Sequence, residues 1–399
     1  MAYNLLCTYY GDDQLIGETF DITELAHDME FTTSLESQPG KFTFYLEKDP
    51  HDILKINLGS VIQFFSDTKI IFYGKVFTIE TDATDVCRVT AYDMMRYLKN
   101  EDSIIIDGSD STMTLRKMFI KIMRAYNLRH RVSSWQNQIN LFPLEAHNFQ
   151  TESLFDILDW CMISEELKHG LDDNLKGRLV KTKKDKNYFR RFYLKCNGAT
   201  IELREIYYDL FYNENGEPKD TFLFIGDESL LNNYEYKIDI DQETYNRFIF
   251  VANKESDDSY SEEDTNKQVQ EQQMVAAMDA GYTISKTGTK LDGKKIGENT
   301  ISKWGILSKV VELKTMEKSN EMVDYMKTVL EIYSQPVRTL KLNAIGYDGV
   351  VAGSAFFLHL SKLGVNYPVY VLSATHRYDS NEHMMELQVS TNINMRKFL

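Results

Sequence analysis

The alternation of apolar and polar positions is most regular near the C-terminus, between Ser319 and Ser390. Apolar residues first recur at intervals of three and four, at Met322, Met326, Val329, Leu330 and Tyr333. This spacing predicts a helix that Ser319 caps and that ends before Pro336, because the residue before a proline avoids helical backbone. The period then changes to two, and turn residues separate four alternating segments, at 339–344, 354–360, 368–376 and 384–390. We expect a helix followed by four strands, folded as a small antiparallel sheet or barrel on that helix.

The first part of the chain, from Tyr3 to about Tyr92, is typical of β-structure. Residues 42–46 alternate apolar and polar side chains, and 70–80 are rich in β-branched and aromatic residues. A helical signal interrupts only at 21–27. The pattern predicts one β domain, a barrel or sandwich of about seven strands, that closes at 89–98 with a strand running into a short helix.

The pattern of the middle of the chain predicts two helices. Thr114 leads one helix and Thr151 caps the other. Their apolar faces comprise Leu115, Met118, Phe119, Ile122 and Tyr126 in the first helix, and Leu154, Ile157, Leu158, Cys161 and Met162 in the second. We expect them to form a mixed helical layer.

Two later segments interrupt the ordered pattern. Lys168 to Arg191 holds nine Lys or Arg against three Asp, which favours a solvated loop over a phosphate or partner contact. Residues 252–275 are acidic and aperiodic and predict a mobile excursion. Helical propensity rises at 271–280, and 281–299 are rich in turn residues. Between and after these segments we expect strands at 191–206, 221–225, 234–240 and 245–251, and ordered structure again at 301–307.

Composition narrows the class of protein. The 399 residues are 43% hydrophobic and 12% aromatic, which is enough for folded cores. The net charge of −15 argues against a general nucleic-acid binder, although it suits an acidic wall that repels DNA. The four cysteines lack metal-ligand spacing and are expected to be reduced and partly buried. We expect no signal peptide and no membrane span.

The side chains that most suggest chemistry are His376 and His383, with Glu382 and Glu386 nearby. Their spacing is not that of a zinc protease, in which a helix presents two histidines one turn apart. A hydrogen-bonded structural histidine pair across a hairpin is favoured over a metal site.

The other candidate groups also favour structural roles. Cys161 lies on an apolar helix face, where a thiol is inert, so it is expected to fill the core. The carboxylate pairs Asp172/Asp173 and Asp257/Asp258 lie in the two irregular segments and are expected to be solvated. Gly305 is expected to let the backbone turn or an aromatic ring pack closely. No phosphate-binding glycine pattern occurs. We expect no catalytic, cofactor-binding or metal residues.

Several short segments together carry a family resemblance: 89–98 at the end of a β domain, Glu243-Thr-Tyr-Asn246 opening a strand, Trp304-Gly-Ile-Leu307 entering a helix, and 370–378 followed by 383–387. In this order they resemble the baseplate hub family of contractile phage tails. More narrowly, they resemble the XkdQ/YqbQ-type tail proteins of Gram-positive prophages and phage-tail-like bacteriocins, fold relatives of the central hub protein of phage T4. The resemblance is weakest at 168–191 and 252–299.

The resemblance implies an α+β, β-rich fold with two tube-like β-barrel or sandwich domains and a mixed helical middle domain. On this basis residues 1–98 are the first tube-like domain, and 99–190 the middle domain with the basic loop 168–191. Residues 191–251 are a β segment shared between the middle and second tube-like domains, 252–300 an excursion, and 301–399 the second tube-like domain.

The implied function is that of a structural hub in a tail particle. A homotrimer would present six similar domains to the six-fold tail tube and three-fold symmetry to the central spike. Its expected partners are its own copies, the tail tube, spike and baseplate wedge proteins and the tape measure protein, with DNA as a passenger that does not bind. A tail-associated cell-wall hydrolase, or a carbohydrate-binding receptor module suggested by the aromatic residues, is the alternative.

Overall fold

The computed structural model describes residues 3–10, 17–36, 38–46, 56–81, 83, 86–107, 112–132, 142–171, 192–206, 223–241, 243–253, 272–279, 285–286, 289–290, 300–313, 329–330, 333–379 and 382–390. The chain divides into two compact units. The first comprises residues 1–236 and 339–393, and the second comprises residues 237–338 and 394–399.

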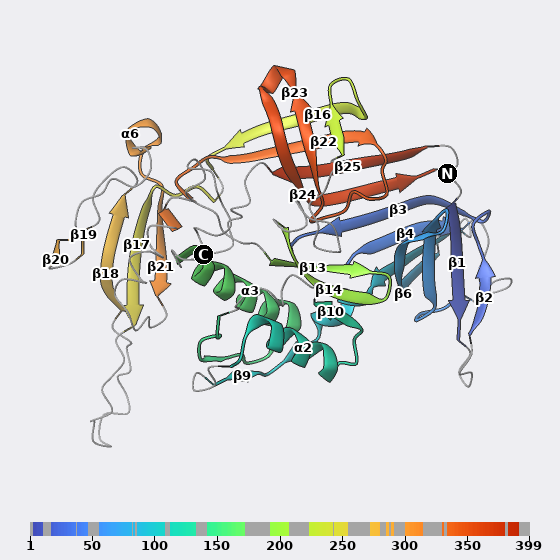
Figure 1. Cartoon of the computed structure of the whole chain (residues 1–399), viewed down its shortest axis with the longest axis horizontal. Helices are drawn as coiled ribbons and strands as arrows, with labels where there is room; N and C mark the ends of the chain where they lie inside the picture. The colour runs from blue at the N-terminus through green and yellow to red at the C-terminus, as the bar shows by residue number, and fades with distance from the viewer. Residues whose placement is uncertain are drawn as a thin grey trace. The chain divides into compact units, whose positions relative to one another are not determined.

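The first unit is built on a large, mainly antiparallel sheet of 13 strands (Figure 1). Eleven of them follow one another in the order β16-β22-β25-β24-β3-β4-β7-β6-β5-β1-β2, and β15 and β23 branch from β24. The strands are β1 Tyr3–Tyr9, β2 Glu18–Asp21, β3 Ala26–Ser34, β4 Lys41–Leu46, β5 Val61–Ser66, β6 Lys69–Thr81, β7 Cys87–Asp93, β15 Phe224–Gly226, β16 Leu231–Asp239, β22 Val337–Ile345, β23 Ala355–Leu360, β24 Val365–Tyr378 and β25 His383–Ser390. The predicted predominance of β-structure is confirmed.

The seven strands predicted before residue 98 are present as β1 to β7. Among the described strands their pairing path is open: it ends at β2 on one side and continues into β24 on the other, so it does not close into a barrel. The helical signal at 21–27 is wrong. The segment forms a single turn, in which the amides of Leu25 and Ala26 both donate to the Ile22 carbonyl, because β3 begins at once afterwards.

The four strands predicted at the C-terminus are confirmed as β22 to β25. Leu340, Leu342 and Ala344 point into the core, as their spacing indicates. Of the helix predicted from Ser319 to before Pro336, only 329, 330 and 333–335 are described; 329, 330 and 333 are helical, and 334 and 335 form the turn that follows. The remainder of that prediction lies outside the described residues.

The predicted helical layer is confirmed. It contains the 3-10 helix η1 Met94–Lys99 and the helices α2 Leu115–Ala125 and α3 Leu154–Leu171. They share one core with the three-stranded sheet β10-β14-β13. The remaining strands of this layer are β8 Glu101–Asp102, β9 Ile105–Ile106, β10 His130–Val132, β11 His147–Asn148, β12 Glu152–Ser153, β13 Phe192–Asn197 and β14 Thr200–Glu205.

The two predicted helix caps have different outcomes. Thr114 caps α2 by accepting from the Lys117 amide. Thr151 does not cap α3: its backbone is left-handed, with φ 54°, and Ser153 Oγ instead accepts from the Asp156 amide at 3.1 Å. The first four residues of the loop predicted at 168–191 belong to α3, and 172–191 lie outside the described residues.

The second unit contains a five-stranded sheet in the order β20-β19-β18-β17-β21. Its elements are β17 Arg247–Asn253, β18 Gln272–Asp279, β19 Ser285–Lys286, β20 Thr289–Lys290, the short helix α6 Ile301–Trp304 and β21 Ser308–Leu313. The strands predicted at 191–206, 221–225, 234–240 and 245–251 are confirmed in the two units as β13 and β14, β15, β16 and β17.

Two predictions in the second unit are wrong. The helix expected at 271–280 is strand β18, because its backbone pairs with β17 along the whole strand and tertiary pairing overrides helix propensity. Residues 304–307 leave α6 and lead into β21 rather than entering a helix. Part of the excursion predicted at 252–275 is strand, and 254–271 lie outside the described residues. None of the helices in the described part of the chain is long and apolar enough to cross a membrane.

Candidate functional site

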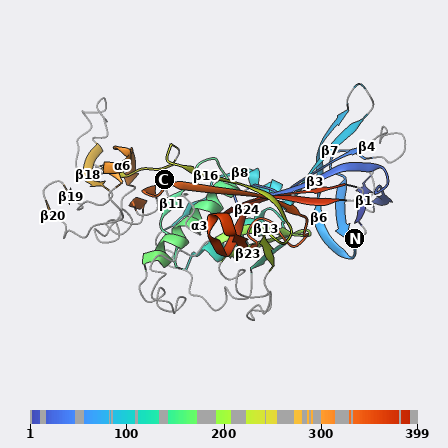
Figure 2. The same ribbon diagram turned by 90° about the horizontal axis from the view of Figure 1, so that it is seen from above.

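The first and last parts of the chain meet in one pair of strands, β3 and β24. They are antiparallel neighbours, with the register running from Ser34 opposite Ser373 to Met29 opposite Tyr378 (Figures 1 and 2). We call this pairing the seam. Eight strands, β16-β22-β25-β24-β3-β4-β7-β6, therefore form one continuous surface.

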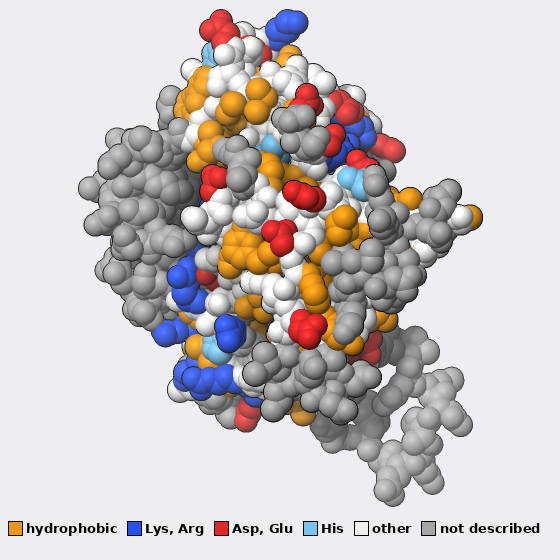
Figure 3. All heavy atoms as spheres, turned by 90° about the vertical axis from the view of Figure 1, so that its right-hand side faces the viewer, with side chains coloured by type: hydrophobic (Ala, Val, Ile, Leu, Met, Phe, Trp, Pro, Cys, Tyr) orange, Lys and Arg blue, Asp and Glu red, His pale blue; other side chains and the backbone are white. Residues whose placement is uncertain are grey.

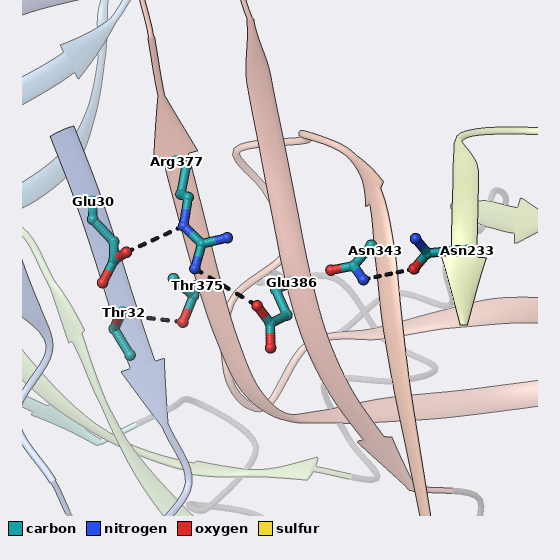
Figure 4. A network of polar contacts seen from close by, with 7 residues as sticks. All are labelled: Glu30, Thr32, Asn233, Asn343, Thr375, Arg377 and Glu386. Atoms are coloured by element: carbon teal, nitrogen blue, oxygen red, sulfur yellow. Dashed lines mark hydrogen bonds and ion pairs between the residues drawn. The ribbon is translucent and has the colours of Figure 1, made fainter. Parts of the chain in front are cut away.

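One side of these eight strands, which we call the polar face, carries polar side chains across the seam (Figure 4). Thr32 Oγ1 lies 3.3 Å from Thr375 Oγ1. Arg377 Nε donates to Glu30 Oε2 at 3.3 Å, and Arg377 Nη2 lies 3.7 Å from Glu386 Oε2. The Arg377 guanidinium on β24 thus links a carboxylate of β3 to a carboxylate of β25, the two strands that flank β24.

The polar face extends away from the seam in both directions. On one side Thr43 lies opposite Thr90, and Thr90 opposite Thr78, which gives a row of hydroxyl groups over β4, β7 and β6. On the other side Asn343 Nδ2 donates to Asn233 Oδ1 at 2.6 Å (Figure 4). Period-two alternation produces this face, because successive side chains of a strand point to opposite sides.

The opposite side of the sheet is apolar and covers two cores. Phe31, Phe42 and Val89 belong to the first core, over β1 to β7, and Leu342 and Leu387 to the second, over β22 to β25. Burial of these side chains away from water determines which face is polar. A shift of the strand register by one residue would exchange the two faces and expose the apolar side chains.

The two histidines singled out in the sequence form a pair beneath the seam, as predicted. His376 Nε2 lies 2.6 Å from the Val350 carbonyl, which can only accept, so Nε2 carries the proton. In a neutral ring Nδ1 is then the acceptor, and it receives the hydrogen bond from His383 Nε2 at 2.8 Å. His383 Nδ1 in turn accepts from the Tyr3 hydroxyl at 3.3 Å. The three hydrogen bonds therefore all point the same way: Tyr3 on β1 donates to His383 on β25, His383 donates to His376 on β24, and His376 donates to the Val350 carbonyl.

Two more side chains complete this buried cluster. The Tyr378 hydroxyl donates to Asp348 Oδ1 at 3.1 Å, and the Tyr378 ring stacks on the His383 ring with centroids 4.2 Å apart. Gly346 leaves room for the His383 ring, because a Cβ at position 346 would lie 2.2 Å from the ring carbons.

Burial keeps both histidines neutral. It lowers the pKa of His376, and it lowers the pKa of His383 to about 4, with His376 adding to the shift and Asp348 opposing it. Burial also raises the pKa of Tyr3 to about 12. Neutral rings are what the one-directional chain requires, since a proton on His376 Nδ1 would face the N–H of His383.

The glutamates near the histidines do not join the pair. Glu386 points to the polar face, where it contacts Arg377, because it has the opposite parity to His383 on β25. Glu382 stands in the turn before β25, where its backbone exchanges hydrogen bonds with that of Asp379. Among the described residues no three His, Cys, Asp or Glu side chains are grouped as metal ligands.

Cys161 fills the core of the helical layer, as predicted. It is fully buried, and burial, together with the nearby Glu165, raises the pKa of its thiol. Gly305 follows α6 with φ 77°, which confirms that it lets the backbone turn. The carboxylate pairs Asp172/Asp173 and Asp257/Asp258 lie outside the described residues.

Sequence reasoning missed one buried carboxyl group, that of Asp93 at the end of β7. Its Oδ2 accepts from the Gly40 amide and its Oδ1 from the Met95 amide, each at 2.9 Å, so it ties β4 to the start of η1. Burial raises the pKa of Asp93 to about 7, although these hydrogen bonds lower it. Asp93 borders a cavity of about 100 Å³ that Cys196 and Ala352 also line. An acidic residue ending a strand before a short helix was the available signal, since it is the pattern of a helix cap.

The fold is one that prophage tail proteins use. The 43 kDa tail protein of prophage MuSo2 from Shewanella oneidensis matches with a TM-score of 0.60 at 9% identity, over 97% of this chain and 98% of that chain. A tail protein from Neisseria meningitidis MC58 matches with a TM-score of 0.58 at 10% identity, over 98% and 96% of the two chains. Prophage tail protein gp18 from Listeria monocytogenes EGD-e matches with a TM-score of 0.53 at 10% identity, over 98% and 95%.

The family follows from the sequence. The model of the YQBQ-like family matches residues 29–170 and 285–390, more than half of the chain. The chain belongs to the YQBQ-like family. No curated protein matches its sequence.

Proposed function

We propose that this chain is a structural protein of a phage tail or a phage-tail-like particle, and that it serves as the hub of the baseplate. Membership of the YQBQ-like family and a fold shared with prophage tail proteins support the assignment to a tail. In this proposal the protein is located in the tail particle, and its work is assembly rather than catalysis.

The observation that carries the proposal is the seam. Within one chain, β1 to β7 form one sheet module and β22 to β25 another, and the pairing of β3 with β24 sets them edge to edge. These modules are the proposed tube-like domains, within residues 1–98 and 301–399. Three copies would present six modules, which suits a six-fold tail tube on one side and a three-fold central spike on the other.

The polar face is the proposed wall of the axial channel. Its hydroxyl rows carry no charge, and its arginines Arg377 and Arg88 lie beside Glu30 and Glu80, at 3.3 Å and 3.6 Å. Paired arginines attract phosphates weakly, which favours passage of DNA over binding. Further copies of the chain, the tube, spike and wedge proteins and the tape measure protein are the proposed partners.

The test is the copy number and position of this chain in an assembled tail tip, seen by cryo-electron microscopy. We expect three copies on the axis, with the polar face toward the lumen. Six copies, or a peripheral position as for a receptor-binding module, would overturn the proposal. Zymography on bacterial cell walls separates the hydrolase alternative: a clearing band that Glu382→Gln abolishes would favour an enzyme.

A further inference from the structure

One stretch of this acidic chain has no acidic residue. From Ser111 to Leu144 the sequence contains six Lys or Arg and no Asp or Glu, although the whole chain has a net charge of −15. The stretch includes α2 and β10, which belong to the helical layer of the first unit. Figure 3 shows Lys and Arg side chains gathered at the lower left of one face of the molecule.

Helix α2 places three of these cations on one line. Its buried residues are Leu115, Met118, Phe119, Ile122 and Met123. At about 100° per residue, positions 117, 121 and 124 lie on the side directly opposite them, and all three side chains are exposed. We call Lys117, Lys121 and Arg124 the basic row. It spans about 10 Å along the helix, at about 1.5 Å per residue.

The basic row has no counter-ion in the part of the chain that the structure describes. Among the described residues, none of its three side chains takes part in an ion pair. Two exposed arginines elsewhere in the chain do have acidic partners: Arg377 lies beside Glu30 and Arg131 beside Glu202.

Part of the basic row is also unfavourable for the helix that carries it, although Arg124 lies in the last turn, where the helix dipole favours a cation. Lys117 lies in the first turn of α2, where the positive end of the helix dipole favours acidic side chains, and that turn contains none. Lys117 and Lys121 are four residues apart and repel each other, as do Lys121 and Arg124, which are three apart. Helix stability alone does not account for this arrangement, whereas an acidic partner outside the chain would.

We propose that the basic row is a docking surface for an acidic protein segment of another chain, with carboxylates spaced to meet the three cations. A partner helix with Asp or Glu at positions i, i+4 and i+7 has the same spacing as the row. Nucleic acid fits less well, because the exposed side of α2 offers no aromatic side chain on which unpaired bases could stack. This inference does not rest on the proposed hub function.

The test compares two triple variants of the full chain. K117Q/K121Q/R124Q removes the basic row while keeping residues of good helix propensity. K69Q/K99Q/K362Q removes three exposed cations elsewhere and changes the net charge equally, and both variants are compared by circular dichroism to establish that they fold. The probes are fluorescent decaglutamate and a short DNA duplex of matched charge, followed by fluorescence anisotropy between about 50 and 200 mM salt.

We expect the wild type to bind decaglutamate with an affinity that falls as salt rises. The basic-row variant should bind about ten-fold more weakly, which is the effect of losing one or two charge-assisted contacts, and the scattered variant should bind like the wild type. Equal weakening in both variants would show a non-specific charge effect and overturn the proposal. Tighter binding of the duplex would identify a nucleic-acid surface instead. Self-association in sedimentation velocity that only the basic-row variant loses, without decaglutamate binding, would identify a second copy as the occupant.

Discussion

Thr32 and Thr375 are 343 positions apart in the sequence, yet they are direct partners across the seam, with their hydroxyl oxygens 3.3 Å apart. Their contact marks the line along which the N-terminal and C-terminal strands become one sheet. The proposed function requires two sheet modules that are joined within one chain, and the seam is what joins them.

The seam can be tested with a cross-link. Directly opposed residues in an antiparallel pair have Cβ atoms about 4.5–5.5 Å apart, close to the span of a disulfide, so T32C/T375C should oxidise readily. Closing so long a loop should stabilise the oxidised protein by about 5–6 kcal/mol in the chain-entropy model. Migration on a non-reducing gel and the urea midpoint with and without reductant measure the two effects.

The native cysteines should not compete in this experiment, because burial raises the pKa of Cys7 to about 11 and raises that of Cys161 and Cys196 as well. T375C alone is the matched control. A double variant that stays reduced under conditions in which exposed thiols oxidise would contradict the β3–β24 register.

The histidine pair predicts a loss of stability in acid. The folded-state pKa of His383 lies near 4, below the unfolded value of 6.5, so the unfolded state takes up protons first as pH falls. The contribution of the pair is complete above pH 6.5 and declines as the pH falls from there toward 4. Between about pH 7 and pH 5 the wild type should lose about 1–2 kcal/mol of unfolding free energy from this source.

The comparison that isolates the pair is urea unfolding of the wild type and of H383Q at both pH values. H383Q keeps a donor and an acceptor but does not titrate, so its stability should fall less between pH 7 and pH 5. The comparison between variants is necessary because Asp93, with its pKa raised to about 7, acts in the opposite sense and weakens the fold as pH rises from about 4 to 7. Parallel losses in the two proteins would show that the histidines are not buried as a neutral pair.

The two arginines that contact Glu202 should contribute unequally to the stability of the fold. Its buried carboxylate lies 2.7 Å from Arg131 Nη2 and 2.7 Å from Arg204 Nη1, and these partners lower its pKa although burial opposes them. The Arg204 side chain is 11% exposed and that of Arg131 is 49% exposed. Glu202→Ala should cost about 3–5 kcal/mol, because it removes a buried carboxylate from the nearly buried Arg204 guanidinium, and Arg131→Ala about 1 kcal/mol or less.

Chemical denaturation of the two variants measures this asymmetry. Equal costs for Glu202→Ala and Arg131→Ala would mean that the inner pair contributes no more than the exposed one. A cost near zero for Glu202→Ala would show that water reaches Arg204.

The Asn246 side chain joins the start of β17 to the segment that leads from α6 into β21. Its Nδ2 donates to the Gly305 carbonyl and its Oδ1 accepts from the Leu307 amide, both at 2.8 Å. Asn246→Ala would leave two backbone groups without these partners and should destabilise the unit by about 2–3 kcal/mol. Asn246→Asp keeps the acceptor and loses the donor, so it should cost less at a pH where the carboxylate is protonated than where it is charged.

Hydrogen exchange of the Leu307 amide follows this contact directly. We expect its protection to fall in Asn246→Ala while amides of the first unit keep theirs. Unchanged protection at Leu307 would contradict the contact.

The family resemblance drew on Glu243-Thr-Tyr-Asn246 and Trp304-Gly-Ile-Leu307 as separate motifs, and the structure shows that they touch through Asn246. The sequence could place each motif next to a strand, but it gave 304–307 the wrong neighbour, a helix in place of β21. Backbone hydrogen bonds to an asparagine side chain leave no periodicity that could have revealed the contact.

The sequence by itself determined the local elements whose period is long and regular. The strands β22 to β25, the apolar faces of α2 and α3 and the seven strands β1 to β7 all follow from alternation, since burial of one face requires it. The pairing of His376 with His383 also followed, because two histidines flanking a short turn between alternating segments meet across a hairpin.

Only the tertiary structure decided how these elements join. The pairing of β3 with β24, the polar face that it creates and the burial of Asp93 depend on contacts between residues far apart in sequence, and strand edges of similar composition pair without a local signature. The same cause explains the wrong prediction at 271–280. There, pairing with β17 along the whole of β18 overcomes a helix preference of roughly a few tenths of a kcal/mol per residue. Local propensity is weak compared with a full ladder of hydrogen bonds and a buried face, so the long-range pairing determines the outcome.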